Sequence, residues 1–114
     1  MRKKVYIAGK IGEAYPSEAT LRKFEKAERL LQSKGYDAFN PTRSGLGAKA
    51  DALAKEKGTD FYREIMLLDL DVLAKCDAIC MLPDWIESPG AEVEFHFAKA
   101  IGLEVMYKNY DKDE

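Results

Sequence analysis

Glu94 is the side chain whose type and spacing point most directly to chemistry in this sequence. A helix predicted from about Pro89 to Ile101 carries it on an apolar stripe. The other residues of that stripe are Ala91, Phe95, Ala98 and Ile101. Because an apolar stripe faces the core, Glu94 is a carboxylate on a buried face, and the positive end of the helix dipole favours its ionised, nucleophilic form. A glutamate that reaches solvent, or that pairs with a basic residue, would show the same spacing.

Two aspartates and one tryptophan are further candidates. Asp69 falls on the inward side of a predicted helix, although a helix break capped by Asp69 explains its place equally well. Asp84 follows a proline at the end of a predicted strand, where a general acid could meet a ligand, but loop aspartates also form turns. Trp85 could stack on a nucleobase or simply cover the core.

A phosphate group could bind at the loop Gly9-Lys10-Ile11-Gly12, which offers backbone N–H groups and one ammonium. The adjacent Glu13 favours a plain tight turn instead. The loop reads GxxG and not GxGxxG, so the dinucleotide-binding motif is missing and hydride chemistry is disfavoured. The segment Gly45–Lys49 also lacks the order of glycines and lysine that a phosphate-binding P-loop requires.

Alternating strands and helices must position these residues. Apolar runs predict buried strands over Val5–Ala8 and Asp77–Leu82. A short strand over Tyr36–Phe39, closed by Asn40-Pro41, and a fourth strand over Leu103–Tyr107 are also predicted. Apolar periodicity and capping residues predict helices from Pro16-Ser17 to Gly35, over Ala48–Lys57, from Thr59-Asp60 through Leu73, and over Pro89–Ile101. A break of the third of these helices near Asp69 is an alternative to a continuous helix. The helix over Ala48–Lys57 has few apolar residues on its inward face.

This order predicts the α/β class, as a small three-layer Rossmann-like or flavodoxin-like domain with a parallel sheet of four strands, or of five. We expect one domain over residues 1–107 and a polar tail over 108–114. Ligands of such sheets bind beyond the carboxyl ends of the strands. Here those ends correspond to Gly9–Tyr15, Asn40–Ala48 and Pro83–Gly90.

Composition excludes several classes of protein. The 114 residues have a net charge of −2, which argues against binding of a nucleic-acid polymer or a membrane surface and favours a small-molecule ligand. Cys76 and Cys80 match neither a CxxC redox pair nor a zinc site, and His96 is the single histidine, so we expect no metal and no cofactor. The apolar stretch Val5–Gly9 is too short for a signal peptide or a membrane span, which predicts a cytoplasmic protein.

Three segments resemble the nucleoside 2-deoxyribosyltransferase superfamily, and together they cover nearly the whole chain. They are Val5–Gly9, Asp69–Asp77, and Ser88–Glu94 with Ala98 and Gly102. Within that superfamily, Leu82–Trp85 followed by Ser88–Ala91 resembles a short bacterial and phage branch known only as a domain of unknown function. The resemblance implies cleavage of the N-glycosidic bond of 2′-deoxynucleosides or of their 5′-monophosphates.

The resemblance also implies roles for individual residues. The nucleophile would be a glutamate four residues after a glycine, which is Glu94 after Gly90. Tyr6 matches the tyrosine that hydrogen-bonds the nucleophile, and Asp69 matches the aspartate that binds the sugar or helps the base leave. Ser88 and the loop 9–12 match the phosphate contacts of the monophosphate hydrolases.

Two departures from that pattern leave the substrate open. His96 stands where the superfamily often has a glycine, and Lys10 with Glu13 replaces a loop usually richer in serine and arginine. Members of the superfamily are at least dimers whose sites borrow residues from a neighbour, which implies a homodimer or a larger homo-oligomer. A second apolar row on the last helix would permit such an assembly, although a buried helix in a monomer explains it too. That row consists of Val93, Phe97 and Ala100.

The sequence therefore predicts Glu94, Asp69 and Tyr6 as catalytic residues. The predicted substrate-binding residues are Gly9, Lys10, Ile11, Gly12, Asp84, Trp85, Ser88 and Gly90. The first hypothesis is cleavage or transfer at the glycosidic bond of a deoxynucleoside or its 5′-monophosphate. A non-catalytic nucleotide-binding module and a small interaction protein without a ligand are the alternatives.

Overall fold

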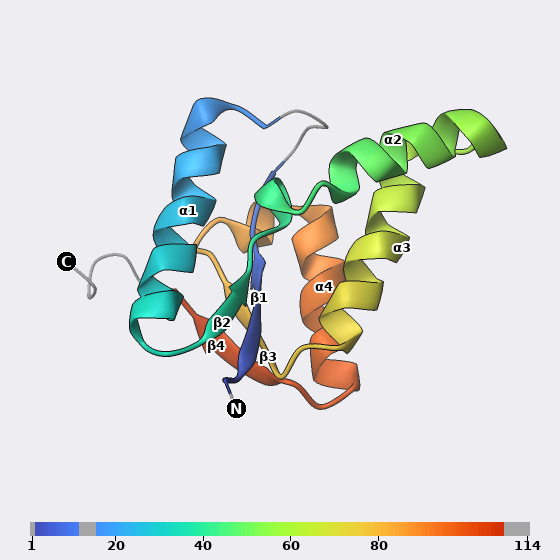
Figure 1. Cartoon of the computed structure of the whole chain (residues 1–114). Coiled ribbons are helices and arrows are strands. Elements are labelled where there is room, and N and C mark those ends of the chain that lie inside the picture. Colours follow the sequence, from blue (N-terminus) through green and yellow to red (C-terminus); the bar gives the residue numbers. More distant parts are fainter. Residues whose placement is uncertain (1, 12–15, 109–114) are drawn as a thin grey trace.

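The computed structural model describes residues 2–11 and 16–108, which form an α/β domain (Figure 1). The strands are β1 (Lys4–Ala8), β2 (Asp37–Phe39), β3 (Ala78–Met81) and β4 (Glu104–Tyr107). The helices are α1 (Glu18–Ser33), α2 (Leu46–Lys57), α3 (Phe61–Ala74) and α4 (Pro89–Ala100). Single 3₁₀ turns over Pro41–Arg43 and Trp85–Glu87 follow β2 and β3.

The sheet has four strands in the order β2-β1-β3-β4, and every neighbouring pair is parallel. Tyr6 of β1 lies opposite Phe39 of β2 and Ile79 of β3. This arrangement confirms the predicted fold class, with four strands and not five in the described part of the chain. Because all strands run the same way, their carboxyl ends meet at one edge, where the loops that follow β1, β2 and β3 come together.

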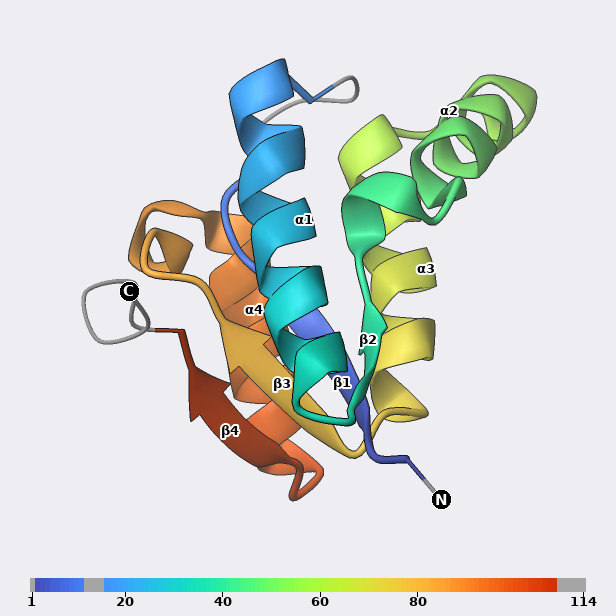
Figure 2. The same ribbon diagram turned by 60° about the vertical axis from the view of Figure 1, so that its left-hand side comes forward.

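Helix α1 covers one face of the sheet, and α3 with α4 cover the other, so the domain has three layers (Figure 2). Alternate residues of β1 point to opposite faces because the side-chain period of a strand is two. Val5 and Ile7 point toward α1, whereas Tyr6 and Ala8 point toward α3 and α4.

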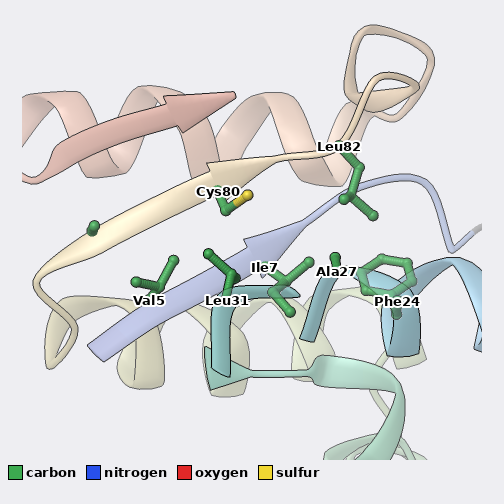
Figure 3. Close-up of a cluster of buried hydrophobic side chains, with 8 residues drawn as sticks. Val5, Ile7, Phe24, Ala27, Leu31, Cys80 and Leu82 are labelled. Atoms are coloured by element: carbon green, nitrogen blue, oxygen red, sulfur yellow. The ribbon is translucent and has the colours of Figure 1, made fainter. Parts of the chain in front are cut away.

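A cluster of buried apolar side chains lies between α1 and the sheet (Figure 3). Its buried members are Val5, Ile7, Phe24, Ala27, Leu31, Ala78, Cys80 and Leu82. Phe24, Ala27 and Leu31 recur at the spacing of one helical face, which is why α1 packs flat against β1 and β3. Cys76 lies in the cluster on the opposite face from Cys80, and the two cysteines form no disulfide bond.

The helix starts confirm two predicted caps and correct a third. The Ser17 and Ser88 side chains accept hydrogen bonds from the N–H groups of Thr20 and Ala91, as N-cap residues do. Asp60 precedes α3 without a side-chain capping bond. The Thr59 hydroxyl donates instead to the Glu64 carboxylate at 2.7 Å, because Glu64 is buried and needs a donor.

Helix α3 runs unbroken through Asp69, so the helix break that would have explained this aspartate does not occur. The segment with the thin apolar face forms α2, which begins two residues before the predicted start at Ala48. Helix α2 packs mainly against α3 and extends away from the sheet (Figure 1). Among residues 2–11 and 16–108, no helix combines the length and the apolar character needed to cross a membrane.

Candidate active site

A cavity of about 730 Å³ lies at the carboxyl edge of the sheet. The end of β1, the segment from β2 to α2, the first turns of α3 and the start of α4 form its walls. The lining residues are Gly9, Ile11, Pro16, Pro41, Thr42, Gly45, Gly47, Ala48, Phe61, Tyr62, Ile65, Met66, Asp69, Ser88, Pro89, Gly90, Ala91, Val93 and Glu94. This volume lies within the usual range of small-molecule sites.

Glu94 lines the cavity as a buried carboxylate, only 6% exposed. Its Oε2 accepts a hydrogen bond of 2.6 Å from the Tyr6 hydroxyl. Tyr6 is fully buried under α3 and α4, where its ring stacks on Phe39 with the centroids 5.2 Å apart. The tyrosine therefore fixes one oxygen of Glu94 from the sheet side.

Asp69 is the second buried acid of the cavity, 8% exposed and contributed by α3. Its Oδ1 is the single buried side-chain oxygen or nitrogen without a hydrogen-bond partner in the described ranges. Leaving such an atom unpaired costs free energy, so natural sites keep one where a ligand can supply the missing donor. Asp69 thus offers a ready acceptor, or a proton, to a bound molecule.

Burial raises the pKa values of Glu94, Asp69 and Tyr6. It raises the pKa of Glu94 to about 8; the Tyr6 hydrogen bond acts against this shift, and the charge of Asp69 adds to it. Burial likewise raises the pKa of Asp69 to about 7, again against the lowering effect of Tyr6. The pKa of Tyr6 itself rises well above 10.0 because of its burial and then the Glu94 and Asp69 charges, so its hydroxyl stays a donor.

These shifts change one expectation about Glu94. The sequence predicted that the helix dipole keeps the carboxylate ionised, whereas desolvation outweighs the dipole and favours the protonated form near pH 7. The two acids therefore hold protons jointly in the neutral range. Such a pair can supply a carboxylate nucleophile and a carboxylic acid in the same cavity.

Two glycines leave room at the cavity edge. A Cβ at Gly9 would lie 2.8 Å from Cδ1 of Leu82, so the chain after β1 can pass the end of β3 only without a side chain. A Cβ at Gly90 would lie 3.3 Å from the Met66 methyl group, which is a tight contact between α4 and α3. Both glycines line the cavity, as do the predicted binding residues Ile11 and Ser88.

Three predicted binding residues lie outside the cavity lining. The Lys10 ammonium lies 3.5 Å from the Glu87 carboxylate. Asp84 accepts the Lys10 backbone N–H at 3.0 Å and forms an ion pair with Lys23. Trp85 packs on Phe95 with ring centroids 4.6 Å apart. These contacts join the loops after β1 and β3 to each other, whereas Gly12 lies outside the described residues.

Sequence reasoning missed the wall that α3 contributes. Phe61 and Ile65 precede Asp69 at four-residue steps, so all three share one face of α3, with Tyr62 and Met66 beside it. That spacing was a usable signal for the wall. In the same described ranges, no three His, Cys, Asp or Glu side chains gather closely enough to hold a metal ion.

Comparison with known proteins gives one match. A search of curated proteins finds no similar sequence. A family model described as Domain of unknown function (DUF4406) matches residues 3–107. This span runs from the start of β1 to the end of β4 and contains the acid pair, Tyr6 and the cavity walls. The chain therefore belongs to the DUF4406 family.

Proposed function

We propose that the protein cleaves the N-glycosidic bond of a deoxynucleoside or its 5′-monophosphate, by hydrolysis or by transfer of the sugar. The observation that carries this proposal is the Glu94 carboxylate, which is buried in the cavity, held by Tyr6, and accompanied by Asp69, whose Oδ1 has no hydrogen-bond partner. Glycoside-cleaving enzymes commonly use two carboxyl groups, one as nucleophile and one as acid. The resemblance to nucleoside 2-deoxyribosyltransferases supports the same assignment.

In the first step, Oε1 of ionised Glu94 attacks C1′ while Tyr6 holds Oε2. A bond forms between Oε1 and C1′, and the bond between C1′ and the base nitrogen breaks. Its electron pair leaves with the base, which takes a proton from the Asp69 carboxyl group. Asp69 and Glu94 hold protons jointly near neutral pH, and the reactive state is the one in which Asp69 carries the proton and Glu94 is ionised. This state is the less populated one, because the pKa of Glu94, about 8, lies above that of Asp69, about 7.

In the second step, an acceptor releases the sugar from Glu94. The Asp69 carboxylate removes a proton from water, the water oxygen bonds to C1′, and the bond between C1′ and Oε1 breaks. Transfer follows the same course with the nitrogen of a second base in place of water. The transition state carries positive charge at the sugar, which the ionised Glu94 stabilises in a poorly solvated site.

The walls divide the cavity in a way that suits a nucleoside. The acids and Ser88 line the side formed by α4 and the middle of α3, where they can meet sugar hydroxyl groups. Apolar side chains of α3, among them Phe61, Ile65 and Met66, line the outer side, where a flat base can pack. The proposal places the scissile bond between these two parts.

The test is release of free base from common 2′-deoxynucleosides and their 5′-monophosphates. We expect release by the wild type and a loss of at least about a thousandfold in Glu94→Gln, which preserves shape but removes the nucleophile. Glu92→Gln is the matched control, because Glu92 is exposed in the first turn of the same helix. It should retain wild-type activity.

Each other outcome counts against the proposal. Activity that survives in Glu94→Gln removes Glu94 from the mechanism. Binding of the same compounds, seen as a rise in melting temperature without release of base, indicates a nucleotide-binding module. Neither release nor binding indicates an interaction protein without a small ligand.

A further inference from the structure

The ionisable side chains among the cavity's described lining residues are acidic or phenolic, and none is basic. Asp69 and Glu94 line the cavity, and none of its described lining residues is a lysine, an arginine or a histidine. A phosphate monoester carries up to two negative charges near neutral pH and binds where cations or free N–H groups face it.

Three cations near the cavity, Lys10, Lys23 and Arg43, already have acidic partners. Lys23 donates 2.8 Å to the Lys10 carbonyl and pairs with Asp84. The Lys10 ammonium faces Glu87, as described above. Arg43, beyond the end of β2, donates 3.2 Å to Glu28 on α1. Moving any of these groups into the cavity would break an existing ion pair.

The start of α4 is a weak anion site despite its helix dipole. Pro89 has no N–H group. The Ala91 N–H is bonded to the Ser88 hydroxyl at 3.2 Å, and the Glu92 N–H is bonded to the Ser88 carbonyl at 3.0 Å. Of the first four helical positions, only Gly90 is left to offer a backbone donor to a ligand oxygen. A phosphate bound there would meet one donor and the two acids.

We infer that the cavity selects uncharged nucleosides and rejects their 5′-monophosphates. This inference rests on the proposed function and narrows its substrate class. A phosphate in this cavity would meet ionised carboxylates in a poorly solvated site whose described lining residues include no cation, so Coulomb repulsion opposes its binding. A neutral 5′-hydroxyl avoids that repulsion and can donate a hydrogen bond to a carboxylate oxygen.

The test is calorimetric titration of the wild type with deoxynucleosides and with their 5′-monophosphates, at about pH 8.5, where both acids are largely ionised. We expect the nucleoside to bind at least about tenfold more tightly than its monophosphate. Lys10→Ala should leave both affinities unchanged, because the Lys10 ammonium faces Glu87 and lines no part of the cavity.

A gain-of-binding variant tests the same inference from the opposite direction. Ala48 is exposed on α2 and lines the cavity, so Ala48→Lys adds an ammonium to the wall. It should improve monophosphate binding relative to nucleoside binding by about tenfold. Ala52→Lys is the matched control, because Ala52 is exposed on the same helix outside the lining. It should leave the ratio of affinities at the wild-type value.

The outcomes separate this inference from the proposed function. Equal or tighter binding of the monophosphate, or its preferential cleavage, overturns the inference and leaves glycosidic cleavage standing. A tenfold loss of monophosphate binding in Lys10→Ala overturns it as well. Nucleoside-selective binding without base release supports the charge selection and overturns the enzymatic proposal. Absence of binding by either ligand overturns both.

Discussion

The two faces of the sheet differ in what they bury, although the same strands build both. Toward α1, β1 presents Val5 and Ile7, which belong to a cluster of buried apolar side chains. Toward α3 and α4 it presents Tyr6, whose hydroxyl reaches the buried Glu94. One strand thus contributes to a stabilising core with one set of residues and to a polar site with the alternate set.

The difference shows where stability is gained and where it is given up. Apolar burial on the α1 face contributes favourable free energy with each side chain. The opposite face holds two acids whose raised pKa values record the cost of burying their charges. Charges retained at such a cost indicate a role other than stability, which is why that face carries the proposed function.

The largest effect is expected on the apolar face. Phe24→Ala removes a fully buried ring between α1 and the sheet and should lower the free energy of unfolding by about 3–5 kcal/mol. Denaturant unfolding measures the change. Leu21→Ala, on the same helix but 38% exposed in the wild type, should cost about 1 kcal/mol or less. Similar losses in both variants would mean that the α1 face is not the main source of stability.

On the polar face, the substitution Glu94→Gln is expected to raise stability, by less than Phe24→Ala lowers it. Because the folded pKa of Glu94 is about 8 and its ordinary value 4.5, the folded state keeps a proton that the unfolded state has released between these pH values. Stability therefore falls as pH rises through this range. Glu94→Gln removes the loss and should therefore have a higher melting temperature than the wild type at pH 8.

Thermal unfolding at intervals from about pH 4 to pH 8 checks this expectation. The melting temperature of Glu94→Gln should fall less with pH than that of the wild type. The residual slope belongs to Asp69, whose raised pKa has the same sign. Glu92→Gln should keep the wild-type slope, and a steeper slope in Glu94→Gln would contradict the burial of a charged Glu94.

The smallest effect on stability and activity is expected for the ion pair between Asp84, in the loop after β3, and Lys23 of α1. Asp84→Asn weakens the ion pair with Lys23 of α1 but keeps an oxygen that can accept the Lys10 N–H. It should cost less than about 1 kcal/mol of stability and less than about tenfold in base release. Asp71→Asn, in an exposed pair with Lys75, is the control. A hundredfold loss of base release in Asp84→Asn would show that Asp84 takes part in the chemistry.

Most of the fold could be predicted from local patterns. Buried strands read as unbroken apolar runs, and Ser17 and Ser88 mark helix starts because their hydroxyls bond backbone N–H groups. The start of α2 could not be placed well, since its buried residues, Ala50 and Ala54, give little periodic signal. Its start follows Gly45, whose φ of 79° is a backbone conformation that a sequence pattern does not reveal.

The candidate site could be predicted only where periodicity determines the direction of a side chain. Glu94 and Asp69 share apolar stripes of their helices, and both line the cavity. The loop residues Lys10 and Asp84 have no such constraint, because their directions depend on partners far along the chain, Glu87 and Lys23. Sequence placed them at the correct edge of the sheet but could not show that they pair away from the cavity.

The hairpin of α2 and α3 has a consequence for how the molecule opens. Helix α2 rests mainly on α3, and Gly45 and Gly58 bracket it with left-handed backbone. Few of its contacts reach the sheet, so its separation from α3 breaks a small part of the native packing and none of the strand ladders. Such a unit unfolds locally at a lower free energy than the whole domain. Because Gly45, Gly47 and Ala48 line the cavity, separation of α2 from α3 would remove part of the cavity wall while the sheet stays intact.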